Sequence, residues 1–226
     1  MLTIVGSHRR GMVLDFGCSD REPAGVLSQG RFYIGLDYLR TTRECYQTRR
    51  DVFGDAQRLP NATGAVHTVL LLEVLEHLAH PDDCLEEIVR VLKSRGIFVM
   101  QAPFIYPIHV TPLDFKRCSI HGMREFAATH GFKIAEEIFF GSSLETATLL
   151  TNIGPSMTAI NCAGRWHPLA LLVLLLPFLA LLFNLLGLIF SRSILVDGIM
   201  AAGYRLLPEK SGCRCILYES KYNCAF

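Results

Sequence analysis

Val13 to Asp20 reads VLDFGCSD, an apolar run that closes on an acid and a glycine. The continuous apolar residues up to Phe16 predict a short buried strand, and Gly17 predicts a turn directly after it. In open α/β sheets, ligands bind beyond the carboxyl ends of the strands, where the backbone approaches them closely. This stretch therefore predicts the first strand of an α/β sheet, with Asp15 and Gly17 at its ligand-binding edge.

Strand-like and helix-like segments alternate through the first 140 residues. One helix is predicted at residues 81–93, where a single face carries the apolar side chains Leu85, Ile88, Val89 and Leu92. A proline begins this helix and acids occupy its first turn. The other predicted elements are strands at residues 12–16, 31–37, 65–72, 96–102 and 132–140 and a helix at residues 119–130. This alternation predicts an α/β fold with a parallel sheet.

Three more polar sites follow successive predicted strands. Asp37 ends the second strand, where a carboxylate can accept hydrogen bonds from both hydroxyls of a ribose. Asp55 and Ala56 follow a weaker third strand and are placed to meet an adenine amino group, while Glu73 leaves the fourth strand. Any one of these acids alone is more often a helix cap or a turn former. Four such sites in order, each just after a strand, predict binding of a nucleotide-type ligand.

The segments VLDFGCSD, YIGLD, DVFGDAQRLP, LLLEVLEHL and GIFVMQAPF resemble, in this order, the successive motifs of class I methyltransferases of the type-11 group. The resemblance covers residues 11–141. It implies a Rossmann-like sheet of seven strands, the last antiparallel, with S-adenosylmethionine lying across the strand ends. Asp37 would face the ribose and Glu73 the reacting methyl group. The positions that the resemblance assigns to the cofactor are Asp15, Gly17, Cys18, Ser19, Asp37, Tyr38, Asp55, Ala56 and Glu73.

The first loop departs from the family pattern. That pattern reads Gly-x-Gly-x-Gly, whereas this sequence has Gly17, Ser19 and Arg21 at the three positions. Side chains at these positions crowd the cofactor, so one alternative is a rearranged or weaker cofactor site. A second alternative is a non-catalytic, membrane-bound scaffold that kept the fold and lost turnover. A dinucleotide-dependent oxidoreductase is disfavoured, because no Gly-x-Gly-x-x-Gly follows the first strand.

A loop after the fifth strand, PFIYPIH followed by TPLDFKR, resembles the substrate-side loop of methyltransferases found beside surface-polysaccharide genes. Methyl transfer is an in-line displacement that depends mainly on alignment. An oxygen or nitrogen acceptor must still lose a proton, and His109 or Asp114 could take it. The alternative is that His109 is an ordinary loop histidine and that Asp114 pairs with Arg117 for structural reasons. His77 is expected to be structural.

The segment from Leu169 to Phe190 contains no charged residue, and its hydropathy favours a bilayer over water. The last strand is expected at residues 213–221 (CRCILYESK), which makes residues 142–212 an insertion between two paired strands and leaves residues 1–141 and 213–226 as the core. Both ends of the insertion must then lie on one side of the membrane. We therefore expect a re-entrant or in-plane hairpin in contact with membrane lipid at the cytoplasmic face, with flanks at residues 144–160 and 194–206. A single span and a buried core helix are the alternatives.

Composition limits the remaining partners. Lys and Arg number 22 against 21 for Asp and Glu, so no basic excess indicates a nucleic-acid partner. The eight cysteines show no zinc-site spacing, which predicts no metal site and reduced thiols, and no apolar stretch of signal-peptide type follows the first ten residues. The expected substrate is a small-molecule or lipid-linked glycan acceptor that is methylated on oxygen.

Overall fold

The computed structural model describes residues 11–18, 32–39, 51–165, 175–191 and 200–210. Its strands are β1 (Met12–Phe16), β2 (Phe32–Asp37), β3 (Val52–Phe53), β4 (Val66–Leu72), β5 (Leu92–Pro103), β6 (Phe132–Phe140) and β7 (Gly203–Lys210). Its helices are the 3₁₀ turn η2 (Leu75–His77), α4 (Pro81–Val91), α5 (Ile120–Thr129), α6 (Ser143–Gly164) and α7 (Leu176–Ser191).

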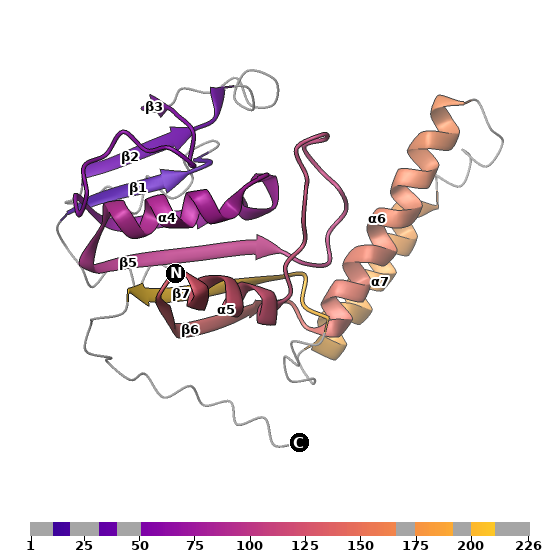
Figure 1. Ribbon diagram of the computed structural model, residues 1–226. Coiled ribbons are helices and arrows are strands. Elements are labelled where there is room, and N and C mark those ends of the chain that lie inside the picture. Colours follow the sequence, from indigo (N-terminus) through magenta and orange to yellow (C-terminus); the bar gives the residue numbers. More distant parts are fainter. Residues whose placement is uncertain (1–10, 19–31, 40–50, 166–174, 192–199, 211–226) are drawn as a thin grey trace. The chain divides into compact units, whose positions relative to one another are not determined.

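The described strands form a seven-stranded sheet in the order β3-β2-β1-β4-β5-β7-β6 (Figure 1). The pairs from β3 to β5 are parallel, which brings their carboxyl ends to one edge of the sheet. Figure 1 shows β7 running in the direction opposite to β5. The predicted seven-stranded α/β sheet with an antiparallel last strand is thereby confirmed.

The core of the sheet follows from the apolar runs of the central strands. Val13, Leu70, Val99 and Leu207 pack together from β1, β4, β5 and β7, and none of them is more than 7% exposed. Burying one such side chain contributes about 1.5–3 kcal/mol, so this cluster anchors the middle of the sheet. Leu85 and Ile88 of the apolar face predicted for α4 are buried, whereas Val89 is half-buried and Leu92 begins β5, so the helix ends two residues before its predicted end.

The position of the last strand corrects the sequence analysis. β7 begins at Gly203, ten residues before the start predicted for it, and the predicted strand at residues 213–221 lies outside the described residues. Tyr204 and Leu206, which were expected at a membrane interface, are buried in the sheet. Pro208 explains the error, because proline donates no hydrogen bond to a strand ladder and is unusual in an interior strand.

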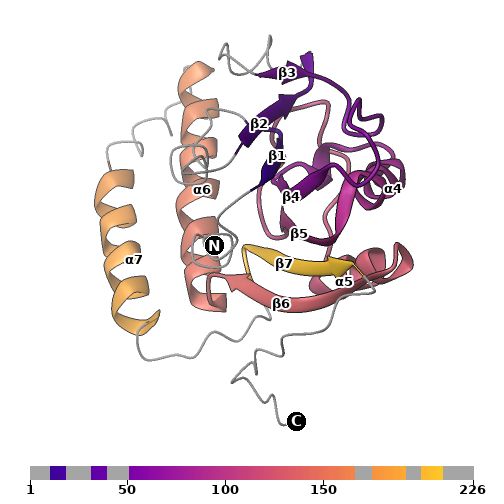
Figure 2. The same ribbon diagram turned by 90° about the vertical axis from the view of Figure 1, so that its left-hand side faces the viewer.

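Residues 139–203 group with residues 104–107 as a second compact unit, which contains α6 and α7. Ser142 begins α6 with a capping box in which its hydroxyl accepts from the backbone N–H of Glu145 and the Glu145 carboxylate accepts from that of Ser142. The two helices lie side by side, with the Asn152 amide donating to the Asn184 carbonyl oxygen at 2.7 Å (Figure 2).

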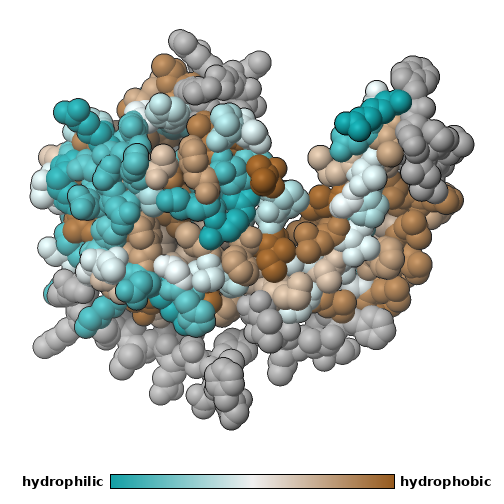
Figure 3. Space-filling view, turned by 45° about the vertical axis from the view of Figure 1, so that its right-hand side comes forward, coloured by the Kyte–Doolittle hydropathy of each residue, from teal (hydrophilic) through white to brown (hydrophobic). Residues whose placement is uncertain are grey.

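Large apolar side chains remain on the surface of this helix pair (Figure 3). On α7, Phe178 is 72% exposed and Leu181 is 68% exposed; on α6, Ile160 is 65% exposed. The predicted apolar segment runs from Leu169 to Phe190, and the structure describes it from Leu175 onward, where it forms α7. Within the described ranges, no helix combines the length and the apolar composition that crossing a membrane requires.

Candidate functional site

Asp15 and Asp37 lie towards the ends of the neighbouring parallel strands β1 and β2. Asp15 is 2% exposed, and its Oδ2 accepts a hydrogen bond from the Tyr33 hydroxyl. Burial raises the pKa of the Asp15 carboxyl to about 6, with a further contribution from the nearby charge of Asp37. Two acids held this close favour a ligand that brings positive charge.

The turn after β1 is held by Gly17. Its φ is +61°, and its N–H donates to the Leu36 carbonyl oxygen at 2.9 Å. A Cβ at this position would come within 2.5 Å of a methyl carbon of Val74, so only glycine fits. The Cys18 thiol packs against Gly35 of β2, which leaves only the backbone of Cys18 for a ligand. The predicted position Ser19 lies outside the described residues.

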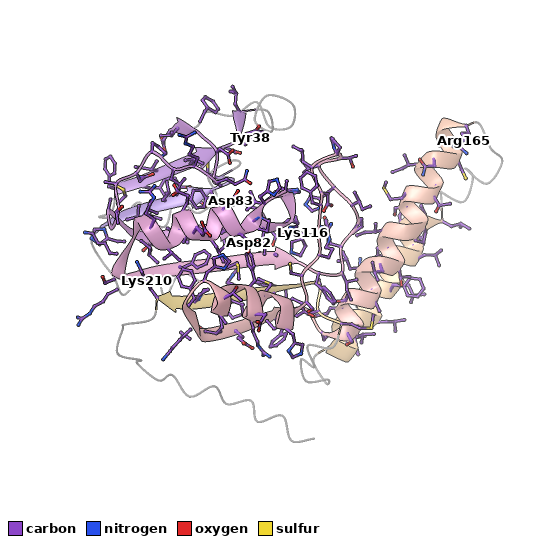
Figure 4. All side chains as sticks on the ribbon, in the orientation of Figure 1. Tyr38, Asp82, Asp83, Lys116, Arg165 and Lys210 are labelled. Atoms are coloured by element: carbon purple, nitrogen blue, oxygen red, sulfur yellow. The ribbon has the colours of Figure 1, made fainter. Side chains whose placement is uncertain are left out.

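The predicted ribose and adenine positions follow β2 and β3. The Asp37 Oδ1 atom accepts from the backbone N–H of Tyr38 at 2.8 Å, and the Tyr38 side chain is exposed at the end of β2 (Figure 4). Asp37 is paired with Phe53 in the register of the two strands, so the turn that carries Asp55 and Ala56 begins beside it. The Asp55 carboxylate accepts from the backbone and side chain of the residue two positions later, which fixes this turn.

Glu73 directly follows β4 and has an unusual backbone conformation. Its φ is +56°, which is uncommon for a residue other than glycine. The Glu73 Oε1 atom accepts from the Gln101 amide at 2.7 Å, and the Arg205 guanidinium donates to the oxygen of that amide. Three strands therefore hold this carboxylate at the sheet edge, and strained backbone that is over-determined in this way is typical of functional sites.

His109 and Asp114 come together in the loop after β5. The Asp114 Oδ2 atom accepts from the backbone N–H of His109 at 2.9 Å and lies 3.3 Å from the ring atom Nδ1 of His109. Arg117 donates two hydrogen bonds to the Asp114 carboxylate and holds its pKa at about 2. Asp114 is therefore ionised at neutral pH and is too weak a base to take an acceptor proton. Its pairing with Arg117, the structural alternative for this residue, is present.

Glu76 and His77 complete this group of side chains, and the sequence analysis did not assign either of them a functional role. The Glu76 side chain is 1% exposed, and its Oε1 atom lies 3.7 Å from Nε2 of His77 and 3.6 Å from Nε2 of His109. Burial raises the pKa of the Glu76 carboxyl to about 8. The rings of His77 and His109 meet edge to face, with centroids 4.9 Å apart.

The residues described form two groups, one at the ends of β1 to β4 and one around His109. S-adenosylmethionine fits the group at the strand ends. The tight turn at Gly17 offers backbone without a side chain, and the carboxylate of Asp37 ends the adjacent strand. The sulfonium and ammonium groups of this cofactor are cationic, which matches the buried acid Asp15, whereas Asp37 is the acid expected at the ribose. In the second group, His109 is the candidate proton acceptor, with Asp114 and Glu76 beside its two ring nitrogens.

Comparison with known proteins agrees with this assignment. Residues 14–100 match the family described as a methyltransferase domain, of the type-11 group. Over 145 residues, the chain is 28% identical to a probable S-adenosylmethionine-dependent methyltransferase of Mycolicibacterium smegmatis; the match covers 58% of this chain and 56% of that protein. The chain thus spans little more than half the length of this curated relative.

Two solved structures share the fold. A putative sarcosine dimethylglycine methyltransferase from Galdieria sulphuraria superposes with a TM-score of 0.56 at 14% identity, over 92% of this chain and 81% of that one. A SAM-dependent methyltransferase from Archaeoglobus fulgidus superposes with a TM-score of 0.55 at 14% identity, over 93% and 95% of the chains. These two likenesses show the fold, and the family match places the similarity to methyltransferase domains of the type-11 group at residues 14–100.

Proposed function

We propose that this chain transfers the methyl group of S-adenosylmethionine to an oxygen of an acceptor, with His109 taking the acceptor proton. The contact between His109 and Asp114 carries this proposal. Because the ionised Asp114 faces Nδ1, it favours the tautomer with the proton on Nδ1 and leaves the lone pair of Nε2 directed away from Asp114. A histidine held in one tautomer is a suitable general base at neutral pH.

The cofactor supplies a methyl group activated by a positively charged sulfur, and the chain supplies positioning. Asp37 would hold the ribose, and Asp55 with Ala56 would face the adenine. Glu73, fixed by Gln101, would lie near the reacting methyl group. Aligning the acceptor oxygen with the methyl group supplies most of the rate enhancement in such a displacement.

The acceptor that we propose is associated with a membrane, such as a lipid-linked glycan. The exposed apolar side chains of α6 and α7 support it, because large apolar patches on a surface mark contact with a membrane or another partner. We place the protein at the cytoplasmic face, where S-adenosylmethionine is found. The resemblance of the loop containing His109 to the polysaccharide-associated enzymes favours a sugar hydroxyl as the acceptor group.

Cofactor binding is tested by calorimetric titration of the detergent-purified full chain with S-adenosylhomocysteine. Wild type is expected to bind with micromolar affinity and Asp37→Ala to lose binding, whereas Asp83→Ala, at an exposed position on α4, binds as wild type does. His109→Ala should bind normally and lose methyl transfer from labelled S-adenosylmethionine to a lipid extract. Folded wild-type protein without binding would favour the inactive scaffold.

Membrane contact is tested by flotation with vesicles of anionic and neutral phospholipid. Phe178→Glu and Leu181→Glu, on the exposed part of α7, are expected to reduce flotation at least about tenfold, because each places a charge in an apolar surface. Thr151→Glu adds the same charge at an exposed polar position on α6 and serves as the control. Equal flotation of all three variants would contradict the membrane proposal.

A further inference from the structure

Glu76, His77 and His109 converge from two segments of the chain. Their ligand atoms, one carboxylate oxygen and two ring nitrogens, all lie within 4.8 Å of one another. Ligands of one tetrahedral ion with bonds of about 2.1 Å are about 3.4 Å apart. The distances of 3.7 Å and 3.6 Å from the Glu76 Oε1 atom to the two Nε2 atoms are close to this value and too long for hydrogen bonds.

The carboxylate of Glu76 is buried without a partner side chain. Within the described residues neither of its oxygens has a hydrogen-bond partner of normal geometry. The backbone N–H that lowers its pKa is that of Glu76 itself. Buried carboxylates are normally satisfied by hydrogen bonds or by a metal, so an unsatisfied one indicates a missing partner. Glu73 and Asp114 add negative charge around Glu76, which favours a cation, whereas the positive charge of Arg117 opposes one.

In both histidines the Nδ1 atom, which faces away from Glu76, already has an oxygen partner. Nδ1 of His77 lies 2.7 Å from the Leu113 carbonyl oxygen, which can only accept, so the proton is on Nδ1. Nδ1 of His109 faces the carboxylate of Asp114 at 3.3 Å. Both rings therefore turn Nε2 towards Glu76. A second partner that fixes the tautomer is a general feature of histidines that bind metals.

We propose that Glu76, His77 and His109 bind one divalent transition-metal ion, such as zinc, manganese or cobalt. Two imidazole nitrogens and one carboxylate oxygen suit these ions better than magnesium or calcium, which prefer oxygen ligands alone. Three protein ligands leave at least one coordination position open, as in catalytic rather than structural sites. Where the proposed methyl transfer holds, an ion at this position would lower the pKa of the acceptor hydroxyl so that its proton can pass to water, and His109 would then act as a ligand in place of its role as general base.

Cobalt binding to the full chain tests the site directly. Protein freed of metal by a chelator is titrated with Co²⁺, and binding is followed by visible absorption and calorimetry. Wild type is expected to bind one equivalent, and Glu76→Gln and His109→Ala to bind at least about 100-fold more weakly. His121→Ala, a change at an exposed histidine of α5, should leave Co²⁺ binding unchanged. Glu76→Gln is expected to fold, because it replaces a buried acid by a neutral side chain of the same shape.

Two outcomes would overturn the metal site. One is equal Co²⁺ affinity in wild type, Glu76→Gln and His109→Ala; the other is a thiolate-to-cobalt absorption band, which would assign the ion to cysteines. S-adenosylhomocysteine binding, measured on the same samples, keeps this test separate from the proposed function. Retained binding in the two site variants shows that they are folded, whereas its absence in wild type would count against the methyltransferase activity and not against the metal site.

Discussion

The ring atom Nδ1 of His109 lies 3.3 Å from the Oδ2 atom of Asp114, which also accepts the backbone N–H of His109 at 2.9 Å. Two contacts from one carboxylate fix both the position of His109 and its ring orientation. Since Arg117 keeps the pKa of Asp114 at about 2, this carboxylate is ionised throughout the neutral range. In the proposed mechanism Asp114 is therefore a positioning residue, and Nε2 of His109 is the atom that would meet the acceptor or an ion.

Asp114→Asn tests this relationship. The amide keeps the shape but removes the charge that selects the tautomer of His109, so we expect kcat to fall roughly 10–100-fold. The affinity for S-adenosylhomocysteine should not change, because the cofactor residues lie on other strands. Steady-state kinetics and calorimetry on the same preparation measure the two quantities.

Glu137→Gln is the matched control for the Asp114 variant. Glu137 pairs with Arg124 in another part of the sheet domain, and the same change there removes an arginine–carboxylate pair without touching His109. Turnover should stay at the wild-type level. If both variants lost turnover equally, the effect would be one of general stability rather than of His109 orientation.

Asp15 makes the stability of the protein depend on pH. Burial raises the pKa of this carboxyl from 3.8 to about 6, so the folded state binds more protons than the unfolded state between these values. Stability should therefore fall as the pH rises from about 4 to about 6, by roughly 3 kcal/mol in total, and the loss should be complete above that range. Urea unfolding of the cofactor-free protein at several pH values measures this change.

Asp15→Asn should remove most of that pH dependence and make the cofactor-free protein more stable at pH 7, because no charge has to be buried. Its amide oxygen can still accept from the Tyr33 hydroxyl. Asp83→Asn, at an exposed position on α4, should leave the slope between pH 4 and 6 as in wild type. An unchanged slope in Asp15→Asn would show that other groups cause it.

Gly17→Ala is expected to destabilise the protein through two separable effects. The left-handed φ of +61° costs a residue with a Cβ about 1–2 kcal/mol. The contact of 2.5 Å between the added Cβ and Val74 costs further stability. Gly131→Ala is the control for the backbone effect alone, because Gly131 has a φ of +78° and no atom lies within 4 Å of a Cβ added there. Denaturant unfolding of both variants should show Gly17→Ala as clearly the less stable, with weaker S-adenosylhomocysteine binding.

A double-mutant cycle isolates the contact between Gly17 and Val74. In the double variant Gly17→Ala with Val74→Ala, the nearest atom to the added methyl group is the Cβ of residue 74 at 3.8 Å, an ordinary contact. Part of the lost stability should therefore return as a favourable coupling of about 1 kcal/mol or more. Strictly additive free energies would mean that the clash is relieved in another way and that the backbone conformation alone makes glycine necessary.

Glu73 offers a direct measure of backbone strain at the site. Glu73→Gly and Glu73→Ala both remove the carboxylate that Gln101 binds, but only glycine adopts the φ of +56° without steric cost. The glycine variant should therefore be more stable than the alanine variant by about 1 kcal/mol in urea unfolding. Turnover should fall in both, and equal stability of the two would show that this conformation is not strained.

Much of the sheet follows from local sequence patterns. Strands β1 and β6 have the bounds that the apolar runs predict, and α4 starts at its predicted proline. These elements are readable because periodicity and terminating residues act within a few positions of the chain. Four acids at strand ends were predicted in the same way, since parallel strands place their carboxyl ends at one edge.

Other features depend on contacts that no local pattern records. Pro208 makes β7 look unlike a strand, yet β7 lies between β5 and β6 in the sheet. His77 and His109 lie 32 positions apart in the sequence, so only the folded chain shows that both face Glu76.

The sequence by itself determined the fold class and the cofactor edge, because both follow from the order of strands and from the residues that end them. The tertiary structure decided the contacts of Asp114 with His109 and Arg117 and the grouping of Glu76 with the two histidines. The physical reason is that pKa values, tautomers and ligand geometry depend on burial and on neighbours brought together from distant positions. A carboxylate such as Glu76 becomes significant only once the fold has buried it beside two histidine rings.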